Sequence, residues 1–370
     1  MNKKLIAIAI GAALGTLPLA SQAGVKIYGH AQVEVADESV DSNLTGGTGN
    51  CPTFSTVDGG TWQDCRTVED NARGRWGIKA SEKLGNGMKA FAQFEWKLDT
   101  TEFKGSTTNR VMQVGLKGGW GTFMAGSLKS PYKYTGGVKY DPFVTTNAEA
   151  RRNGGMSGGV YGHNGFVSNS IGYMTPKMNG FQGWIIYSPD EDGHSSRGDD
   201  GDWAASLKFS AGNWEVFVAG VNNEYNGSSS ATTSDYSAWK IGGKVKFGNH
   251  TFLVQYEDAN NFGQVKDRDG RILFLGYHLK SGNNLFVVQF GDGKLDCGKA
   301  TSCPVNPQDA EWTYWTVGAI HKFSKTARAF AAFSRTSVDN AYYGQPLVGK
   351  TSDDGDRQAF TIGLRKDFST

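Results

Sequence analysis

The sequence predicts an all-β fold, a 16-stranded antiparallel transmembrane β-barrel. Segments of about ten residues alternate apolar and polar side chains, and a period of two places each set on one side of a sheet. Tight turns rich in Gly and Asn recur along the chain, separated by longer polar connections. The 51 glycines, 9 prolines and 12% aromatic residues are typical of strands and turns rather than of helices.

Residues 1–23 have the features of a signal peptide. Asn2-Lys3-Lys4 is a short positive head, Leu5 to Leu14 is an apolar run, and Ser21-Gln22-Ala23 supplies the small residues of a cleavage site. The run is too short for a spanning helix. We therefore expect an exported chain that starts at Gly24, with residues 24–370 forming the barrel.

The exported chain carries no formal net charge. Removing Lys3 and Lys4 from the 38 basic residues leaves 36, which match the 36 acidic ones. Ion selectivity must therefore come from the local placement of charges. Nucleic acid is not expected as a partner, because phosphate binding needs a concentrated basic face.

Short turns define the order of the strands. They lie at residues 84–87, 118–121, 177–180, 211–213, 247–249, 281–284 and 323–326. In all of them except 323–326, Gly and Asn accept the positive φ of tight hairpins. Between them we expect sixteen strands, at residues 25–37, 68–81, 88–100, 109–118, 121–130, 168–176, 181–189, 202–211, 214–225, 235–247, 250–260, 271–280, 284–291, 311–322, 327–338 and 357–368. An even number places both termini at one rim of a closed barrel.

The faces of these strands separate a barrel from a soluble sandwich. Trp239 and Ile241 share one face of a strand, and Lys240 lies on the other. A sandwich can alternate in the same way. The strand length, the aromatic residues near strand ends and the alternation of short turns with long connections favour a barrel with a wet interior and a lipid-facing exterior.

Four cysteines form two close pairs, Cys51 with Cys65 and Cys297 with Cys303. Export and loop-like flanks favour two local disulfides, although other pairings stay open. Neither spacing is that of a zinc site, and no metal or cofactor is expected.

Several motifs resemble general porins of Gram-negative outer membranes. Arg75-Trp76-Gly77-Ile78-Lys79, Asn109-Arg110-Val111-Met112-Gln113 and Asn169-Ser170-Ile171-Gly172-Tyr173 are similar to strands of that family. The resemblance implies a homotrimer whose third outer loop folds into the lumen, with acids on the loop facing arginines on the wall. It places Arg75 and Arg110 among those arginines and Asp141 in the acidic loop tip. The position of a third wall arginine holds Phe166 instead, so Arg73, Arg151 or Arg152 is the expected replacement.

The residues themselves suggest a basic constriction between residues 128 and 168. Alternation places Arg73, Arg75 and Lys79 on one face, and we expect Arg110 and Met112 to share the inner face of their strand. The loop adds Lys129, Lys133, Lys139, Arg151 and Arg152 against Asp141 and Glu149. This excess of positive over negative side chains predicts weak anion preference in a pore for small hydrophilic solutes. Four loop tyrosines, Tyr132, Tyr134, Tyr140 and Tyr161, are expected to pack the loop against the wall rather than form a track for sugars.

Other functions are less well supported. A channel specific for an anion or organic acid would use the same basic constriction and is the alternative. Gly155-Met156-Ser157-Gly158-Gly159 fits a nucleophile-elbow pattern, but no strand precedes it and no helix follows it, so we expect no catalytic residues. An exported β-sandwich adhesin would dissolve without detergent. Acid clusters in the outer loops suggest contact with outer-membrane lipid and lipopolysaccharide through bridging cations, or simply solvated charge.

Overall fold

The computed structural model describes residues 24–41, 62–69, 74–101, 108–151, 153–156, 165–189, 201–224, 234–296, 310–339 and 355–370. The signal peptide expected at residues 1–23 lies outside these ranges, as do Cys51, Arg73, Arg152, Cys297 and Cys303. Cys65 belongs to a described strand, but its side chain is not among those described. The two disulfides therefore stay predictions.

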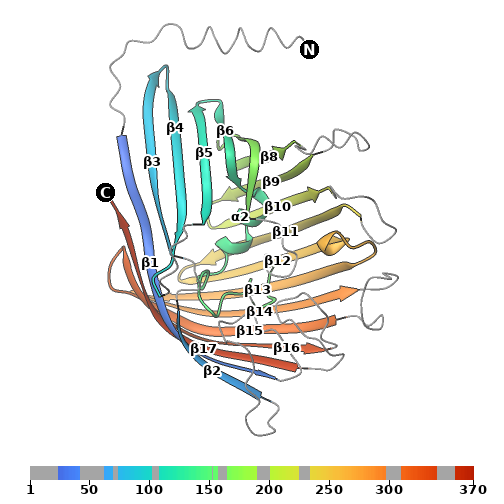
Figure 1. Ribbon diagram of the computed structural model, residues 1–370. Coiled ribbons are helices and arrows are strands. Elements are labelled where there is room, and N and C mark those ends of the chain that lie inside the picture. Colours follow the sequence, from blue (N-terminus) through green and yellow to red (C-terminus); the bar gives the residue numbers. More distant parts are fainter. Residues whose placement is uncertain are drawn as a thin grey trace.

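One antiparallel sheet contains all the strands of the described ranges (Figure 1). These are β1 (Gly24–Asp41), β2 (Trp62–Glu69), β3 (Gly74–Gly85), β4 (Met88–Leu98), β5 (Asn109–Gly118), β6 (Gly121–Lys129), β7 (Phe166–Met174), β8 (Phe181–Ser188), β9 (Asp202–Ala211), β10 (Trp214–Asn223), β11 (Tyr236–Phe247), β12 (His250–Asn260), β13 (Asp269–Ser281), β14 (Asn284–Asp296), β15 (Ala310–Lys322), β16 (Ala327–Asp339) and β17 (Gly355–Ser369).

The sheet closes into a barrel through β1. This strand pairs along its length with β17, from Tyr28 opposite Ser369 to Val40 opposite Arg357. Its other edge pairs with β3 in its first half and with β2 in its second half. Because β2 and β3 are two pieces of one position around the barrel, the wall has sixteen positions. The predicted closed 16-stranded barrel is confirmed, although the strand expected at residues 68–81 is divided in two.

The two rims of the barrel differ, as the sequence predicted. Short turns join β3 to β4, β5 to β6, and each later pair up to β15 and β16, and both ends of the barrel lie at this rim. Asn86 and Gly87 in the first of these turns have φ values of 49° and 73°, a conformation that suits Asn and Gly in tight hairpins. Longer connections occupy the opposite rim. In barrels of this type, short turns face the periplasm and long loops face outward.

The wall has an apolar outer face and a polar inner face. In β11, Trp239 and Ile241 are 44% and 52% exposed, whereas Lys240 between them is completely buried. The exposed apolar side chains recur on every second residue of most strands, as a lipid-facing surface requires. The alternation predicted from the sequence is therefore confirmed.

The connection from β6 to β7 is the third at the long-loop rim and lies against the inner wall (Figure 1). It contains the short helix α2 (Pro131–Tyr134) and the 3₁₀ turn η1 (Gly137–Lys139). A further 3₁₀ turn, η2 (Phe262–Gln264), follows β12. Among the described residues, no helix is long and apolar enough to cross a membrane.

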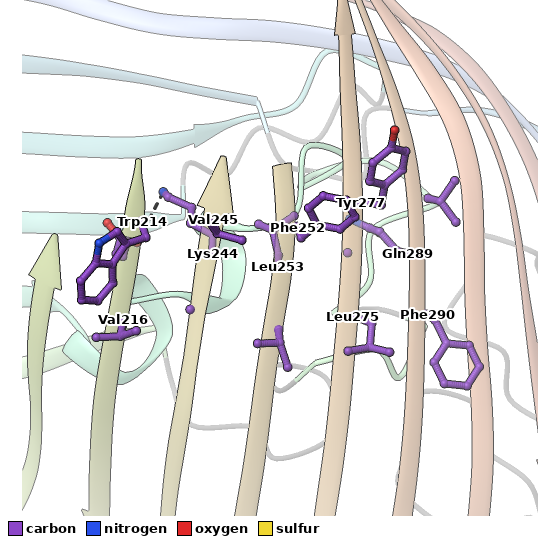
Figure 2. Close-up of a pocket in the computed structure, with 15 residues that line it drawn as sticks. Trp214, Val216, Lys244, Val245, Phe252, Leu253, Leu275, Tyr277, Gln289 and Phe290 are labelled. Carbon is purple, nitrogen blue, oxygen red and sulfur yellow. Dashed lines mark ion pairs between the residues drawn. The ribbon is translucent and has the colours of Figure 1, made fainter. Parts of the chain in front are cut away.

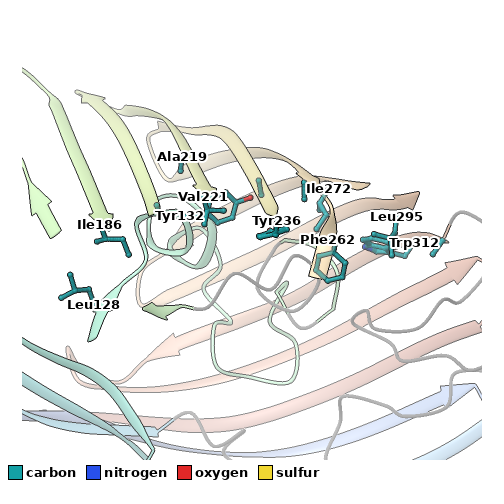
Figure 3. Packing of buried hydrophobic residues seen from close by; sticks show 14 of the residues in the cluster. Leu128, Tyr132, Ile186, Ala219, Val221, Tyr236, Phe262, Ile272, Leu295 and Trp312 are labelled. Atoms are coloured by element: carbon teal, nitrogen blue, oxygen red, sulfur yellow. The ribbon is translucent and has the colours of Figure 1, made fainter. Parts of the chain in front are cut away.

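Side chains of the inner wall hold this connection at many points. The Tyr132 hydroxyl donates to Glu257 of β12 at 3.0 Å, and Tyr314 of β15 donates to the carbonyl of Ala148 at 3.0 Å. Tyr132 belongs to a buried cluster with Val221 of β10 and Tyr236 of β11 (Figure 3). The expected packing role is confirmed for Tyr132 and Tyr140, each 1% exposed.

A pair of glycines lets the connection approach the wall closely. A Cβ atom placed on Gly291 of β14 would lie 2.4 Å from the Cα atom of Gly155. Any side chain at position 291 would therefore push the connection away. This contact explains the glycine at the start of the apparent nucleophile-elbow pattern in terms of packing. Residues 157–159 of that pattern lie outside the described ranges.

Candidate constriction site

The candidate site lies where β3, β4 and β5 face the start of the β6–β7 connection. Arg75 of β3 and Glu95 of β4 both point to the inner face, because Gly77 is the direct partner of Glu95 and Arg75 is two residues away. The Arg75 guanidinium Nη1 lies 3.8 Å from Glu95 Oε1. The strand register alone thus brings the first wall arginine beside a carboxylate.

Arg110 reaches the same carboxylate through an irregularity in β5. Glu95 is opposite Val111 and Trp96 is opposite Asn109, so Arg110 is left without a direct partner. Such a bulge re-aims a side chain. Arg110 Nε donates to Glu95 Oε1 at 2.9 Å, and its guanidinium lies 4.7 Å from the Phe166 ring centroid.

Met112 does not share the inner face with Arg110, contrary to expectation. It is the direct partner of Phe94, which belongs to the exposed apolar face of β4. On the inner face of β5, Gln113 donates to Gln93 of β4 at 3.1 Å. The bulge therefore changes which residues of β5 line the interior.

Glu95 is the charged residue of the candidate site that our interpretation of the sequence missed. It is 2% exposed and also accepts a hydrogen bond from the Tyr28 hydroxyl at 2.8 Å. Its place between Phe94 and Trp96 in an alternating strand assigned it to the polar face. That signal did not show that its carboxylate would be shared by two arginines.

Three lysines of the loop segment complete the positive charge. Lys129 Nζ and Lys139 Nζ lie 5.4 Å and 5.8 Å from the centroid of the Tyr134 ring. Lys133 Nζ lies 5.8 Å from the Phe166 centroid, and the two rings are 6.1 Å apart. We call Arg75, Arg110, Lys129, Lys133 and Lys139 the basic cluster.

The charges of the basic cluster influence one another. The pKa of Lys139 is lowered, first by partial burial and then by the positive charges of Arg75 and Lys208. A cation whose neighbours are also cations gains from an arriving anion. Lys79, also predicted for this site, lies on the inner face nearer the short-turn rim, with Nζ 4.4 Å from the centroid of the Tyr28 ring.

The two loop acids expected at the constriction point into the loop itself. Asp141 is 4% exposed and accepts hydrogen bonds from the Phe143 and Ala150 amides, both at 2.8 Å, and from Gln289 of β14 at 2.9 Å. Burial is the largest influence on its carboxyl and raises the pKa of Asp141 to about 7.

Glu149 also binds groups of the loop rather than facing the lumen. It is 0% exposed, accepts from the Thr145 amide at 2.8 Å and pairs with Arg151 Nη2 at 2.9 Å. Arg151 is buried with it, so the structure brings Lys129, and not Arg151, beside Arg75 and Arg110. The acid that faces the two wall arginines is Glu95.

Besides the lumen, the barrel has a groove on its outer surface. It has a volume of about 630 Å³ and is lined mainly by outward-facing apolar side chains of β10 to β14, among them Trp214, Phe252 and Leu275 (Figure 2). Gly243 and Gly276 are also part of its lining. This groove belongs to the apolar belt of the barrel and not to the charged interior.

The closed barrel, its apolar belt and its charged interior define a transmembrane β-barrel of the outer-membrane type. The chain belongs to the Gram-negative porin family, whose model matches residues 7–341.

The relatives support this assignment. The major outer membrane protein P.IB of Neisseria gonorrhoeae is 28% identical over 264 residues, which cover 70% of this chain and 61% of that protein. The chain thus spans less than two thirds of the length of that relative.

Solved structures share the fold. An anion-selective porin from Comamonas acidovorans superposes with a TM-score of 0.69 at 18% identity, covering 94% of this chain and 100% of the other. The trimer form of OmpT, an outer membrane protein of Vibrio cholerae, superposes with a TM-score of 0.62 at 14% identity, covering 94% and 99%.

Proposed function

We propose that this outer-membrane protein forms a water-filled channel for the passive diffusion of ions and small hydrophilic solutes, with a weak preference for anions. The basic cluster carries this proposal, because three of its five cations, Arg75, Arg110 and Lys129, share one wall carboxylate, Glu95. Close cations in a narrow passage raise the local concentration of anions.

The β6–β7 connection would narrow this channel. Its anchors on β1, β12 and β15 hold it across the inner wall, and Lys133 and Lys139 extend from it toward the wall arginines. A narrow passage at this level makes every solute pass the basic cluster. As a diffusion channel, the protein needs no catalytic residue and no cofactor.

Planar-bilayer recordings test the proposal. In a salt gradient of potassium chloride, the reversal potential should lie on the side expected for anion preference, and it should move toward zero in the R75Q/R110Q variant. A strong cation preference of the wild-type protein would contradict the assignment. A channel specific for one organic acid would instead show conductance that saturates with, and is blocked by, that acid.

Four further features belong to the proposal. Homotrimer assembly is supported by the trimer form of the structurally similar OmpT, and crosslinking in detergent tests it. Cleavage after Ala23 and the disulfides Cys51–Cys65 and Cys297–Cys303 rest on the sequence alone. Mass spectrometry of the mature protein, with and without reduction, would show the N-terminus and the cysteine pairing. Outer-membrane lipid and lipopolysaccharide are the expected surroundings.

A further inference from the structure

Three lysines stand side by side on the inner face at the short-turn rim. In the strand register, Lys83 of β3 is opposite Lys89 of β4, and Lys89 is opposite Lys117 of β5. Alternation places them on the same face as Arg75, Glu95 and Gln113. All three are exposed. We call them the lysine row.

Among the described residues, the lysine row has no acidic partner on its own face. None of the three ammonium groups takes part in an ion pair or side-chain hydrogen bond within these ranges. Glu82 precedes Lys83 but belongs to the opposite face, where it pairs with Ala90. Glu95 is the carboxylate on the inner face of β4, six residues from Lys89, which corresponds to about 20 Å along a strand.

Three neighbouring lysines destabilise the sheet unless a negative charge compensates theirs. Directly opposed side chains have Cβ atoms about 5 Å apart, and like charges at this distance destabilise a sheet. Here the repulsion occurs twice in succession. A multivalent oxyanion placed among the three ammonium groups would turn both repulsions into attractions, and lysine is a common ligand of phosphate-type anions.

A second row faces the same rim. Lys322 of β15 is opposite Arg328 of β16, which is opposite Arg365 of β17. One carboxylate accompanies these cations, since Arg365 Nε donates to Asp367 at 2.8 Å. Only β1 separates this row from β3, because β1 pairs with β17 along one edge and with β3 along the other. Cations therefore line the short-turn mouth on both sides of β1.

We propose that the short-turn mouth is a second anion site, which binds multivalent oxyanions through the lysine row. It is distinct from the basic cluster, because Lys83 is eight residues from Arg75 along β3. Eight residues span about 27 Å of a strand, which is more than the Debye length of about 10 Å at 0.1 M salt. The inference rests on the proposed channel and adds a direction to it. A multivalent anion entering from the periplasmic side meets the lysine row first and is held there.

Side-dependent block in a planar bilayer tests this site, with inorganic tripolyphosphate as the probe. We expect block from the short-turn side at a concentration about tenfold lower than from the long-loop side, since a lined vestibule concentrates counter-ions. The chamber facing the long loops is identified with a biotin label on K266C, which streptavidin reaches from that side.

Variants separate this site from the basic cluster. K83Q/K89Q/K117Q should lose the asymmetry of block, and K83R/K89R/K117R should keep it because the charges remain. K266Q/K294Q, which removes lysines at the opposite rim, is the control and should also keep it. Equal block from both sides of the wild-type channel, or asymmetry that persists in K83Q/K89Q/K117Q, would overturn the proposal.

The reversal potential distinguishes the proposed role of the basic cluster from that of the lysine row. In K83Q/K89Q/K117Q the anion preference in potassium chloride should persist, because the basic cluster is intact. Loss of preference there would place selectivity at the mouth and contradict the separation of the two sites. A wild-type channel with no anion preference but with asymmetric block would refute the role of the basic cluster and leave the lysine row supported.

Discussion

Arg110 Nε lies 2.9 Å from Glu95 Oε1, although regular alternation would place the two side chains on opposite faces of the wall. Without the bulge, Arg110 would be opposite Trp96 and would point toward lipid. The bulge brings the arginine inside, where it shares Glu95 with Arg75. The charge balance of the candidate constriction therefore depends on one extra residue in β5.

Replacing Glu95 by Gln should increase the anion preference. Among the described residues, this carboxylate is the one wall acid paired with both Arg75 and Arg110, so its loss leaves their charges uncompensated. We expect the anion-to-cation permeability ratio to rise by about fivefold or less, because a unit charge about 4 Å from an ion is worth about 1 kcal/mol in water. The reversal potential in a salt gradient measures this change. Q93E adds a carboxylate to the same face and should lower the ratio.

The bulge predicts opposite effects for two adjacent positions. M112K places a charge on the lipid face and should destabilise the barrel by about 1–4 kcal/mol, depending on depth, with little change in selectivity. Q113K places the same charge in the lumen and should leave stability nearly unchanged while strengthening anion preference. Denaturant unfolding in lipid vesicles compares the two. Equal destabilisation by both variants would contradict the assigned faces.

The wall could be predicted from the sequence because its signals are local. A period of two decides the face of Trp239 and Lys240, and a turn such as Asn86-Gly87 needs only its own two residues. The inward position of Arg110 was expected from a family resemblance, but the accompanying position of Met112 was wrong. A one-residue bulge leaves no mark in the apolar pattern, and it reverses every face assignment on one side of it.

The loop could not be predicted in the same way. The family resemblance placed Asp141 at a loop tip facing the lumen, whereas this side chain caps two backbone amides of the loop and contacts Gln289 from a strand far along the chain. Those contacts depend on the path of an irregular segment, which has no period. A carboxylate in such a segment satisfies buried amides as readily as it faces a pore.

Asp141 should make the stability of the folded protein depend on pH. Burial raises its pKa from an ordinary value of 3.8 to about 7, so between these values the folded protein holds a proton that the unfolded chain releases. The contribution of Asp141 to stability therefore falls as pH rises from about 4 to about 7, and is constant above pH 7. The midpoint of heat unfolding, measured against pH, reports this.

D141N isolates the contribution of that carboxyl. Asn cannot ionise, so the unfolding midpoint of the variant should lack this part of the pH dependence. The amide also cannot accept hydrogen bonds at both of its ends, and the variant should be less stable at low pH by about 1–3 kcal/mol. D202N, which alters an acid at the end of β9, serves as the control. A wild-type curve that runs parallel to that of D141N from pH 4 to pH 7 would show that Asp141 does not titrate as described.

The pair Arg357 and Glu38 should determine how firmly the loop is held. Arg357 Nε lies 2.6 Å from Glu38 Oε1 and Arg357 Nη2 lies 3.2 Å from Asn147 Oδ1 of the loop, with both charged residues buried. R357M leaves a buried carboxylate without its cation and should cost about 3–5 kcal/mol, whereas E38Q/R357M should cost less. Both variants remove a contact with the loop, so single-channel conductance should rise and fluctuate more.

The control variant R335M breaks the partly exposed Arg335–Asp356 pair nearby and should cost about 1 kcal/mol, with unchanged conductance. Unchanged conductance in R357M would mean that the other contacts suffice to hold the loop.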